Sequence, residues 1–316
     1  MEDSAVVTAE DVRLMQGLAE KVTALRLELV NSDASVGELA WIWGKGHAKI
    51  GASWRRELWF AGRDLVAWGW VTLPHRRPNG QEITQASLAY QVHPDHAELV
   101  DEVIAWYDRG PAVDRTLLAQ AADDVGRQRW GAHGYVTDPA ALDDWTQLNV
   151  RDLDDIEKPV LPTGFRFRNA DGAGSAAAVR AHVDAWGSTI YDAESYEGVR
   201  QTWPYRGDLH VLVEAPDGTM AASAIIWLDE ANKTAEFEPV GTHPGYRRLG
   251  LGRALLLHGM GLAREAGANH MTVVCLGAAA HPKARGLYYS VGFRKFSQDV
   301  SLIKPAAARP DDLRET

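Results

Sequence analysis

Two glycines and three arginines crowd the start of one apolar segment, in the stretch HPGYRRLGLGRALLLHG. Gly250 and Gly252 stand where an expected helix begins, although glycine inside a helix costs about 1 kcal/mol relative to alanine. Free amide N–H groups at a helix N-terminus bind anions, and a residue without a β-carbon lets the backbone approach a diphosphate closely. Arg247, Arg248 and Arg253 supply positive charge beside them. The stretch therefore predicts a turn that binds phosphate groups.

Two common phosphate-binding motifs do not fit this turn. The loop of nucleotide hydrolases needs Lys and then Ser or Thr after its second glycine, whereas Leu251 and Gly252 follow Gly250 here. The dinucleotide fingerprint needs a third small residue for helix–strand packing, and Leu255 occupies that position. The pattern that is met is Arg-x-x-Gly-x-Gly, starting at Arg247.

This pattern resembles the coenzyme A loop of the GNAT acetyltransferase superfamily, R/Q-x-x-G-x-G/A. Upstream, EFEPVGTHP resembles the central strand of that superfamily, and downstream HPKARGLYYSVGF resembles its N-x-x-A-x-x-L-Y-x-x-x-G-F segment. In this segment Ala284 and Tyr288 match, and His281 stands where Asn is common. The resemblance covers residues 164–304 and implies acetyl-CoA as the co-substrate, with no metal. The residues that it implies in coenzyme binding are Val240, Gly241, Thr242, Arg247, Arg248, Leu249, Gly250, Leu251, Gly252, Arg253, His281 and Ala284.

Acetyl transfer to an amine needs a base, because an alkylammonium with a pKa near 10.4 is protonated at neutral pH. The resemblance implies Glu236 as this base, with Glu238 as a second candidate. The alternative is that both carboxylates bind the positive charge of the acceptor amine and that catalysis is mostly positioning. Side chains two apart on a strand share a face, and two neighbouring carboxyl groups raise the pKa of one of them. A bulge in the strand would separate them instead. The resemblance also implies Tyr288 as the acid for the leaving thiolate, and a main-chain N–H near Val240 as the oxyanion donor.

The two halves of the sequence follow the same order of elements. A strand, then His-Pro, then a helix and a further strand occur in QASLAYQVHPDHAELVDEVIAWYD with DRTLLAQAA, and again around the turn at 243–250. Alternating strands and helices favour an α/β fold with a mixed sheet. The acidic, proline-containing stretch NVRDLDDIEKPVLPTGFRF reads as a linker. We expect two tandem GNAT-like domains, 1–158 and 159–316. This tandem arrangement resembles mycothiol synthase-like acetyltransferases.

The first copy lacks the arginine–glycine turn. The acidic AELVDE stands at that place and would repel a diphosphate. We therefore expect a degenerate first domain that completes the acceptor pocket or supports the fold, with its tryptophan-rich pieces LAWIWGKG and LVAWGWV as possible pocket walls. In the second domain, the loop from 185 to 205 is expected to contact the acceptor. Its Tyr191, Glu194 and Trp203 are compatible with a cationic ligand.

Composition limits the function classes. The net charge of −10 argues against general nucleic-acid binding, and no apolar run reaches the about 20 residues of a membrane span. Cys275, the single cysteine, favours the cytoplasm and is expected to be buried and inert. His93, His96 and His243 lack the carboxylate or cysteine partners of a metal site.

The sequence thus predicts a cytoplasmic acetyl-CoA-dependent N-acetyltransferase, a monomer or homodimer, that acetylates a small-molecule amine by direct attack in a ternary complex. Two alternatives stay open: a protein or peptide amine as the acceptor, and a non-catalytic acyl-CoA sensor. A sensor would bind acetyl-CoA without releasing thiol.

Overall fold

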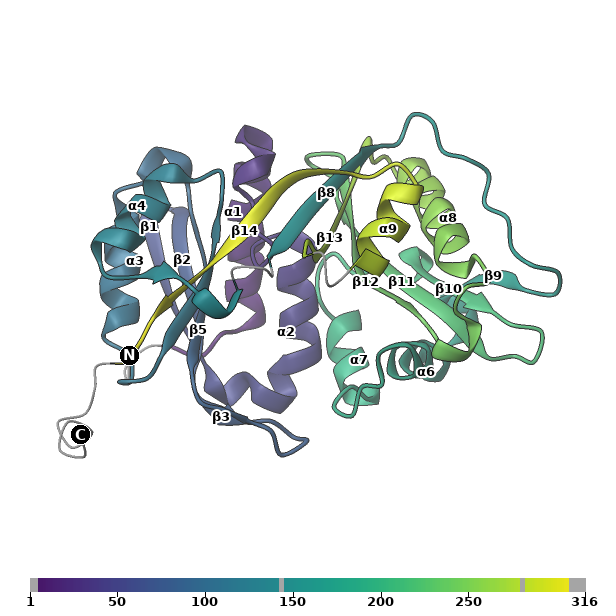
Figure 1. The fold of residues 1–316 in the computed structure, drawn as a ribbon, viewed down its shortest axis with the longest axis horizontal. Helices are drawn as coiled ribbons and strands as arrows, with labels where there is room; N and C mark the ends of the chain where they lie inside the picture. Colours follow the sequence, from purple (N-terminus) through teal and green to yellow (C-terminus); the bar gives the residue numbers. More distant parts are fainter. Residues whose placement is uncertain (1–4, 142–144, 279–281, 307–316) are drawn as a thin grey trace.

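One mixed sheet runs through both halves of the protein (Figure 1). The computed structural model describes residues 5–141, 145–278 and 282–306. In this part of the chain the sheet has twelve strands, in the order β1-β2-β5-β6-β14-β8-β13-β12-β11-β10-β9, with β7 paired to β14. Helices pack on its faces, which confirms the predicted α/β class with a mixed sheet.

The first half contributes four helices and eight strands within the described residues. They are α1 (Ala9–Leu25), α2 (Val36–Ile50), β1 (Trp54–Ala61), β2 (Asp64–Thr72), β3 (His75–Arg76), β4 (Glu82–Ile83), β5 (Ala86–Val92), α3 (Leu99–Asp108), β6 (Arg115–Gln120), α4 (Asp124–Ala132), β7 (Val136–Thr137) and β8 (Thr146–Asp152). The pair β3–β4 forms a small sheet of its own, apart from the main sheet.

The second half contributes the elements that flank the predicted turn. They are β9 (Arg166–Asn169), α5 (Ala170–Ala173), α6 (Ser175–Trp186), α7 (Ala193–Arg200), β10 (His210–Glu214), β11 (Met220–Asp229), β12 (Thr234–Thr242), α8 (Leu251–Glu265), β13 (His270–Leu276), α9 (Pro282–Ser290) and β14 (Arg294–Lys304). The strand, helix and further strand expected around the turn are present as β12, α8 and β13. Apolar side chains of β10 to β13 and α8 bury one core.

The internal repeat predicted from the sequence is visible in matching details of the two halves. In each, a strand ends at a His-Pro pair that opens a short 3-10 turn before a helix. His93 Nδ1 accepts a hydrogen bond from the Asp95 amide at 3.2 Å, and His243 Nδ1 accepts one from the Gly245 amide at 3.0 Å. These histidines cap turns, as polar residues at strand–helix junctions commonly do.

The halves exchange their last strands, which the sequence did not predict. Strand β8 of the first half lies between β13 and β14, and the end of β14 lies between β6 and β7 of the first half. In Figure 1, β14 crosses from the second half to the first. The linker prediction is therefore wrong for residues 149–152, which belong to β8 and pair with β13.

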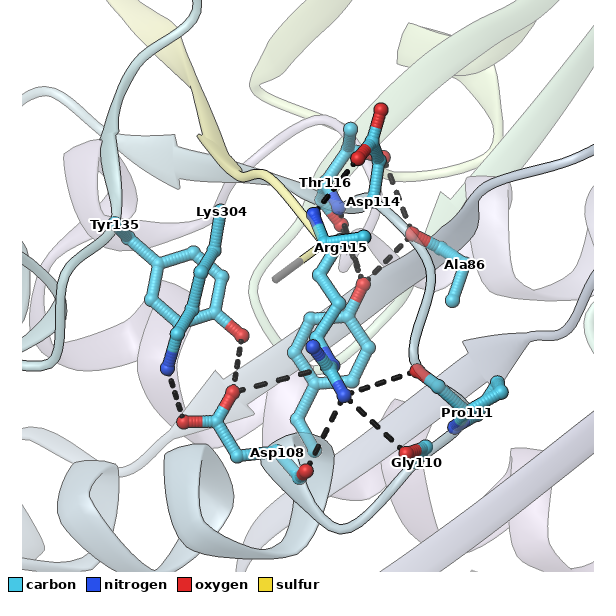
Figure 2. Close-up of polar contacts among 11 residues, drawn as sticks. Ala86, Asp108, Gly110, Pro111, Asp114, Arg115, Thr116, Tyr135 and Lys304 are labelled. Carbon is cyan, nitrogen blue, oxygen red and sulfur yellow. Dashed lines mark hydrogen bonds and ion pairs between the residues drawn. The ribbon is translucent and has the colours of Figure 1, made fainter. Parts of the chain in front are cut away.

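A polar cluster holds the end of β14 in the first half (Figure 2). Asp108 at the end of α3 accepts from Lys304 Nζ at 2.6 Å and from the Tyr135 hydroxyl at 3.0 Å. Arg115 Nη2 donates to three backbone carbonyls around the end of the same helix. The exchanged strand is thus fixed by side chains as well as by its ladder.

Helix α2 of the first half packs on α7 of the second. The two cross where each carries a glycine: a β-carbon on Gly44 would lie 2.7 Å from Val199 Cα, and one on Gly198 would collide with the Gly44 carbonyl. This close crossing brings the start of α2 to the central strand β12 of the second half.

Candidate active site

The predicted phosphate-binding turn lies between β12 and α8 and contains two left-handed residues. Arg248 has φ +70° and Gly250 has φ +80°. A left-handed conformation costs a residue with a β-carbon about 1 kcal/mol, whereas glycine adopts it freely. Gly250 is thus needed for its backbone conformation, and Arg248 is held in a strained one.

The start of α8 presents unpaired amide groups. The N–H groups of residues 248–253 have no hydrogen-bond partner in the described part of the chain, and Gly250, at the N-cap, supplies no side chain to cap the helix. Together with the helix dipole, these groups form a positive end suited to an anion. Leu249 is exposed beside them, while Leu251 is buried and anchors the helix in the core.

Gly252 answers a different need from Gly250. A β-carbon there would lie 3.1 Å from Leu287 Cδ2 and 3.6 Å from Thr242 Oγ1. The first turn of α8 therefore runs close to both α9 and the end of β12.

The three arginines of the turn have different surroundings. Arg247 donates from Nε to the Thr242 carbonyl at 3.2 Å and from Nη2 to the Ala185 carbonyl at 3.3 Å. Arg253 forms an ion pair with Glu157 at 2.8 Å. Of these three arginines, only Arg248 has a side chain without a partner among the described residues. It is therefore the arginine most available to a ligand.

Next to this turn, strands β12 and β13 separate. They pair only from Thr234 with His270 to Phe237 with Val273. Beyond that point residues 240–242 of β12 pair with β11 but with no strand on the other side, and β13 continues with β8. The inner edge of β12 at Val240–Thr242 is open to an extended ligand. Gly241 is required here, because a β-carbon would lie 2.8 Å from Ala185 of α6.

The two candidate carboxylates face different cavities. The register of β12 shifts between Phe237 and Val240, which interrupts the alternation of side chains. Glu236 is 8% exposed and lines a small interior cavity, whereas Glu238 is partly exposed and lines a larger one. Burial raises the pKa of Glu236 to about 7, with a further rise from Glu238. Burial also raises the pKa of Glu238, and Lys45 opposes that rise.

Tyr288 projects from α9 into the interior and is 6% exposed. Burial raises the pKa of its hydroxyl above the ordinary range, and the charges of Glu238 and Cys275 raise it further. Tyr289, the next residue, is exposed, and its hydroxyl accepts from Gln147 Nε2 at 2.9 Å. Cys275 is buried and its Sγ accepts from Asn149.

Of the other expected coenzyme contacts on this segment, Ala284 is exposed on the first turn of α9. His281 lies outside the described residues.

The larger cavity is shared by both halves and measures about 750 Å³. From the second half it is lined by Glu238, Pro239, His182, Trp186 and residues 187–191; from the first half by α2, Trp54 and the β3–β4 region. Of the residues expected to contact the acceptor, Tyr191 lines this cavity. Glu194 instead forms an ion pair with Lys49, at 2.7 Å between Nζ and Oε2. Trp203 stacks with the Arg13 guanidinium, whose Cζ lies 3.6 Å from the centre of the ring.

The tryptophan-rich pieces of the first half divide between wall and core. Trp41 of α2 lines the shared cavity, while Trp68 of β2 is fully buried in a core cluster of the first half.

Several residues of α2 at this site were not predicted. Ser35, Gly37, Glu38 and Lys45 all lie near Glu236 or Glu238. The sequence Ser-Val-Gly-Glu before an apolar run is a helix-start signal, but it does not indicate what the helix faces. No three His, Cys, Asp or Glu side chains gather as a metal site would need within the described residues. No helix there is both long and apolar enough to cross a membrane.

Comparisons with known proteins agree with this geometry. Residues 177–293 match the model of the acetyltransferase (GNAT) family. The chain is 30% identical over 227 residues to the mycothiol acetyltransferase of Beutenbergia cavernae, covering 68% of each protein.

Solved structures share the fold at low sequence identity. A tandem GNAT protein from the clavulanic acid biosynthesis pathway superposes with a TM-score of 0.63 at 16% identity, over 97% of this chain and 99% of that one. A GCN5-related N-acetyltransferase from Sphaerobacter thermophilus gives 0.58 at 18% identity, over 96% of both chains.

Proposed function

This chain belongs to the GNAT acetyltransferase family, and on that premise we propose that it transfers the acetyl group of acetyl-CoA to the amine of a small molecule, by direct attack in a ternary complex. The family uses acetyl-CoA as its co-substrate. The observation that carries the proposal is the open edge of β12 beside the unpaired amides of α8.

The residues present suit coenzyme A. The diphosphate is assigned to the amides of Gly250, Leu251 and Gly252, with the free side chain of Arg248 beside them. The pantetheine arm is assigned to the open edge of β12 at Val240–Thr242, like an added strand. Arg247 and Arg253, which already have partners, would shape the turn and its charge. Ala284 on α9 would close the opposite side.

Catalysis is assigned to Glu236 and Tyr288. Glu236 lines the small interior cavity and not the shared one. It therefore accepts the proton of the acceptor amine through water, as the nitrogen attacks the thioester carbonyl carbon. A backbone N–H near Val240 stabilises the oxyanion. As the carbon–sulfur bond breaks, the Tyr288 hydroxyl gives its proton to the thiolate. A carboxyl group with a pKa of about 7 suits a base at neutral pH, and the raised pKa of Tyr288 keeps it protonated.

Glu238 is assigned to the acceptor. It lines the shared cavity, and an ammonium group there would meet its carboxylate before losing a proton. The volume of the cavity is that of a site for a drug-sized molecule, which supports a small acceptor over a protein one. Because a relative is named mycothiol acetyltransferase, a mycothiol-related amine is the first acceptor to test.

We also propose that residues 1–158 are a degenerate copy and 159–316 the catalytic one. In the first half β5 and β6 separate beyond Leu88 and Leu117, as β12 and β13 do in the second. Here, however, the chain itself bonds to both strands: Gln120 Nε2 donates to the Val30 carbonyl, and Asn31 Nδ2 donates to the Tyr90 carbonyl. These contacts support the proposal that the first half has lost coenzyme binding, because its own residues 30–31 bond to the two separated strands.

A single set of assays tests the proposal. Calorimetry with coenzyme A should show one binding site, and thiol release from acetyl-CoA should depend on an amine from a panel that includes mycothiol-related amines. Binding without thiol release for any amine would support the sensor instead. Thiol release only with peptide amines would support a protein acceptor.

A further inference from the structure

The carboxyl group assigned as the base is held by the other half of the protein. Ser35 Oγ donates a hydrogen bond to Glu236 Oε1 at 2.9 Å, across 201 residues of sequence. The same oxygen of Ser35 accepts from the Glu38 amide at 3.0 Å and so caps α2. The Ser35 hydroxyl thus caps the N-terminus of α2 in the first half and donates a hydrogen bond to a carboxylate of the second half.

The second carboxylate oxygen lies against Gly37 in the first turn of α2. A β-carbon on Gly37 would come within 2.6 Å of Glu236 Oε2 and within 2.6 Å of Trp227 Cδ1. Only glycine allows the helix this close, and the close approach sets Glu236 beside the positive end of α2. The carboxylate therefore has little freedom to move.

We propose that Ser35 and the first turn of α2 position Glu236 for acetyl transfer, so that the first half supplies part of the catalytic machinery. This rests on the proposed function, in which Glu236 is the base. Ser35 acts through Glu236 and is a positioning residue. The first half would then be needed for turnover even though it has lost its own coenzyme slot.

The charges around Glu236 make this contact consequential. Glu238 lies on its own strand, Glu38 faces it from α2, and Asp229 of β11 lines the same small cavity. Through Glu38 the group extends to Asp33 and to the cation Lys45. Burial and Glu238 raise the pKa of Glu236, while the Ser35 hydroxyl and the Gly37 backbone lower it. Losing the hydroxyl should therefore raise that pKa.

The test measures Glu236 itself, without a need for the acceptor. In the full chain labelled with [5-¹³C]glutamate, the Glu236 resonance is identified by its loss in Glu236→Gln. In Ser35→Ala its titration midpoint should rise by about one pH unit, the scale of one hydrogen bond to a charged group. Ser35→Thr, which keeps a hydroxyl group, should leave the titration midpoint at the wild-type value. Ser35→Gly removes the same hydroxyl but keeps a residue that helix N-caps accept, so it serves if Ser35→Ala folds poorly.

Thr8→Ala is the matched control, because Thr8 caps α1 of the same half through its side chain without reaching Glu236. It should leave the midpoint unchanged. With an amine that supports thiol release, Ser35→Ala and Ser35→Gly should lower kcat about fivefold at pH 7, recover at higher pH, and leave coenzyme A binding unchanged.

An unchanged midpoint in Ser35→Ala and Ser35→Gly, or an equal shift in Thr8→Ala, would overturn the inference. Failure of the proposed function is separate: it would show as full turnover in Glu236→Gln, whatever the midpoints.

Discussion

Lys304 Nζ lies 2.6 Å from Asp108 Oδ2, although 196 residues separate them in the chain (Figure 2). The last strand of the protein is therefore tied to a helix of the first half. Strand β8 makes the reciprocal connection into the second half. Each half thus depends on a strand from the other. We therefore expect the two halves to unfold together, because unfolding of one half removes a strand from the sheet of the other.

Removing this ion pair should destabilise the protein. Lys304→Met keeps the apolar stem but loses the charge, which also lies 5.3 Å from the centre of the Tyr135 ring. The pair is about one-third exposed, so we expect a loss of about 1 kcal/mol in the free energy of unfolding, measured in urea. Lys21→Met breaks the more exposed pair with Asp64 and should cost less. An equal loss in both variants would mean that the anchor has no special role.

Glu236→Gln and Tyr288→Phe should each lower kcat about tenfold or more, because each removes one proton-transfer group. Coenzyme A binding, measured by calorimetry, should stay within about twofold of the wild type. Tyr289→Phe is the matched control, since its hydroxyl bonds to Gln147 of β8 and its loss should leave kcat unchanged. A variant that keeps full turnover removes its residue from the mechanism.

The activity should depend on pH through Glu236. A base with a pKa of about 7 is protonated and inactive below that pH, so kcat/KM should fall as pH decreases through about 7. The residual activity of Glu236→Gln should lack this acidic limb. An unchanged limb in Glu236→Gln would assign it to another group, with Glu238 the next to test by Glu238→Gln.

The three arginines of the turn should differ in their contribution to coenzyme A binding. Arg248→Ala should raise the Kd of coenzyme A about tenfold, because the Arg248 side chain is free to bond a phosphate. Arg253→Ala should raise it less, since that guanidinium is paired with Glu157. Arg63→Ala, in an exposed turn of the first half, controls for the lost charge. A larger effect for Arg253→Ala than for Arg248→Ala would contradict the assignment.

Stability should respond to pH through the buried carboxyl group of Asp299 on β14. Its Oδ2 accepts from the Ser32 amide at 3.0 Å, while Oδ1 has no partner in the described part of the chain. Burial raises its pKa to about 7, against about 3.9 when unfolded. The folded state therefore favours the protonated form. This contribution is fully present below about pH 4 and is lost as pH rises through about 7.

Asp299→Asn keeps the shape without the charge. We expect it to stabilise the protein by about 2 kcal/mol more at pH 8.5 than at pH 5, measured as urea unfolding at each pH. Asp154→Asn, at an exposed position, should show no such difference. If the two variants behave alike, Asp299 does not carry the pH dependence.

Local patterns were enough to predict the second half. The His-Pro junction and the glycines at the start of α8 act over a few residues, and the elements beside them appear where these signals stand. Gly250 illustrates this, because its left-handed φ follows from the turn alone. The opposite exposures of Tyr288 and Tyr289 likewise follow from helical periodicity.

Contacts between distant residues could not be read in the same way. The pattern of β8 marks a strand but not its neighbour, because strand pairing depends on which edges the whole chain leaves open. The separation of Glu236 from Glu238 needed the register shift of β12.

The sequence by itself determined that the chain carries the motifs of the GNAT family in its second half, with a glycine turn before an apolar helix, since these features are formed by residues close together in the chain. Only the tertiary structure decided that α2 of the first half reaches Glu236, that the larger cavity has walls from both halves, and that β8 and β14 are exchanged. The physical reason is that these arrangements come from close packing, as where Gly44 meets α7, and packing brings together residues that no local spacing relates.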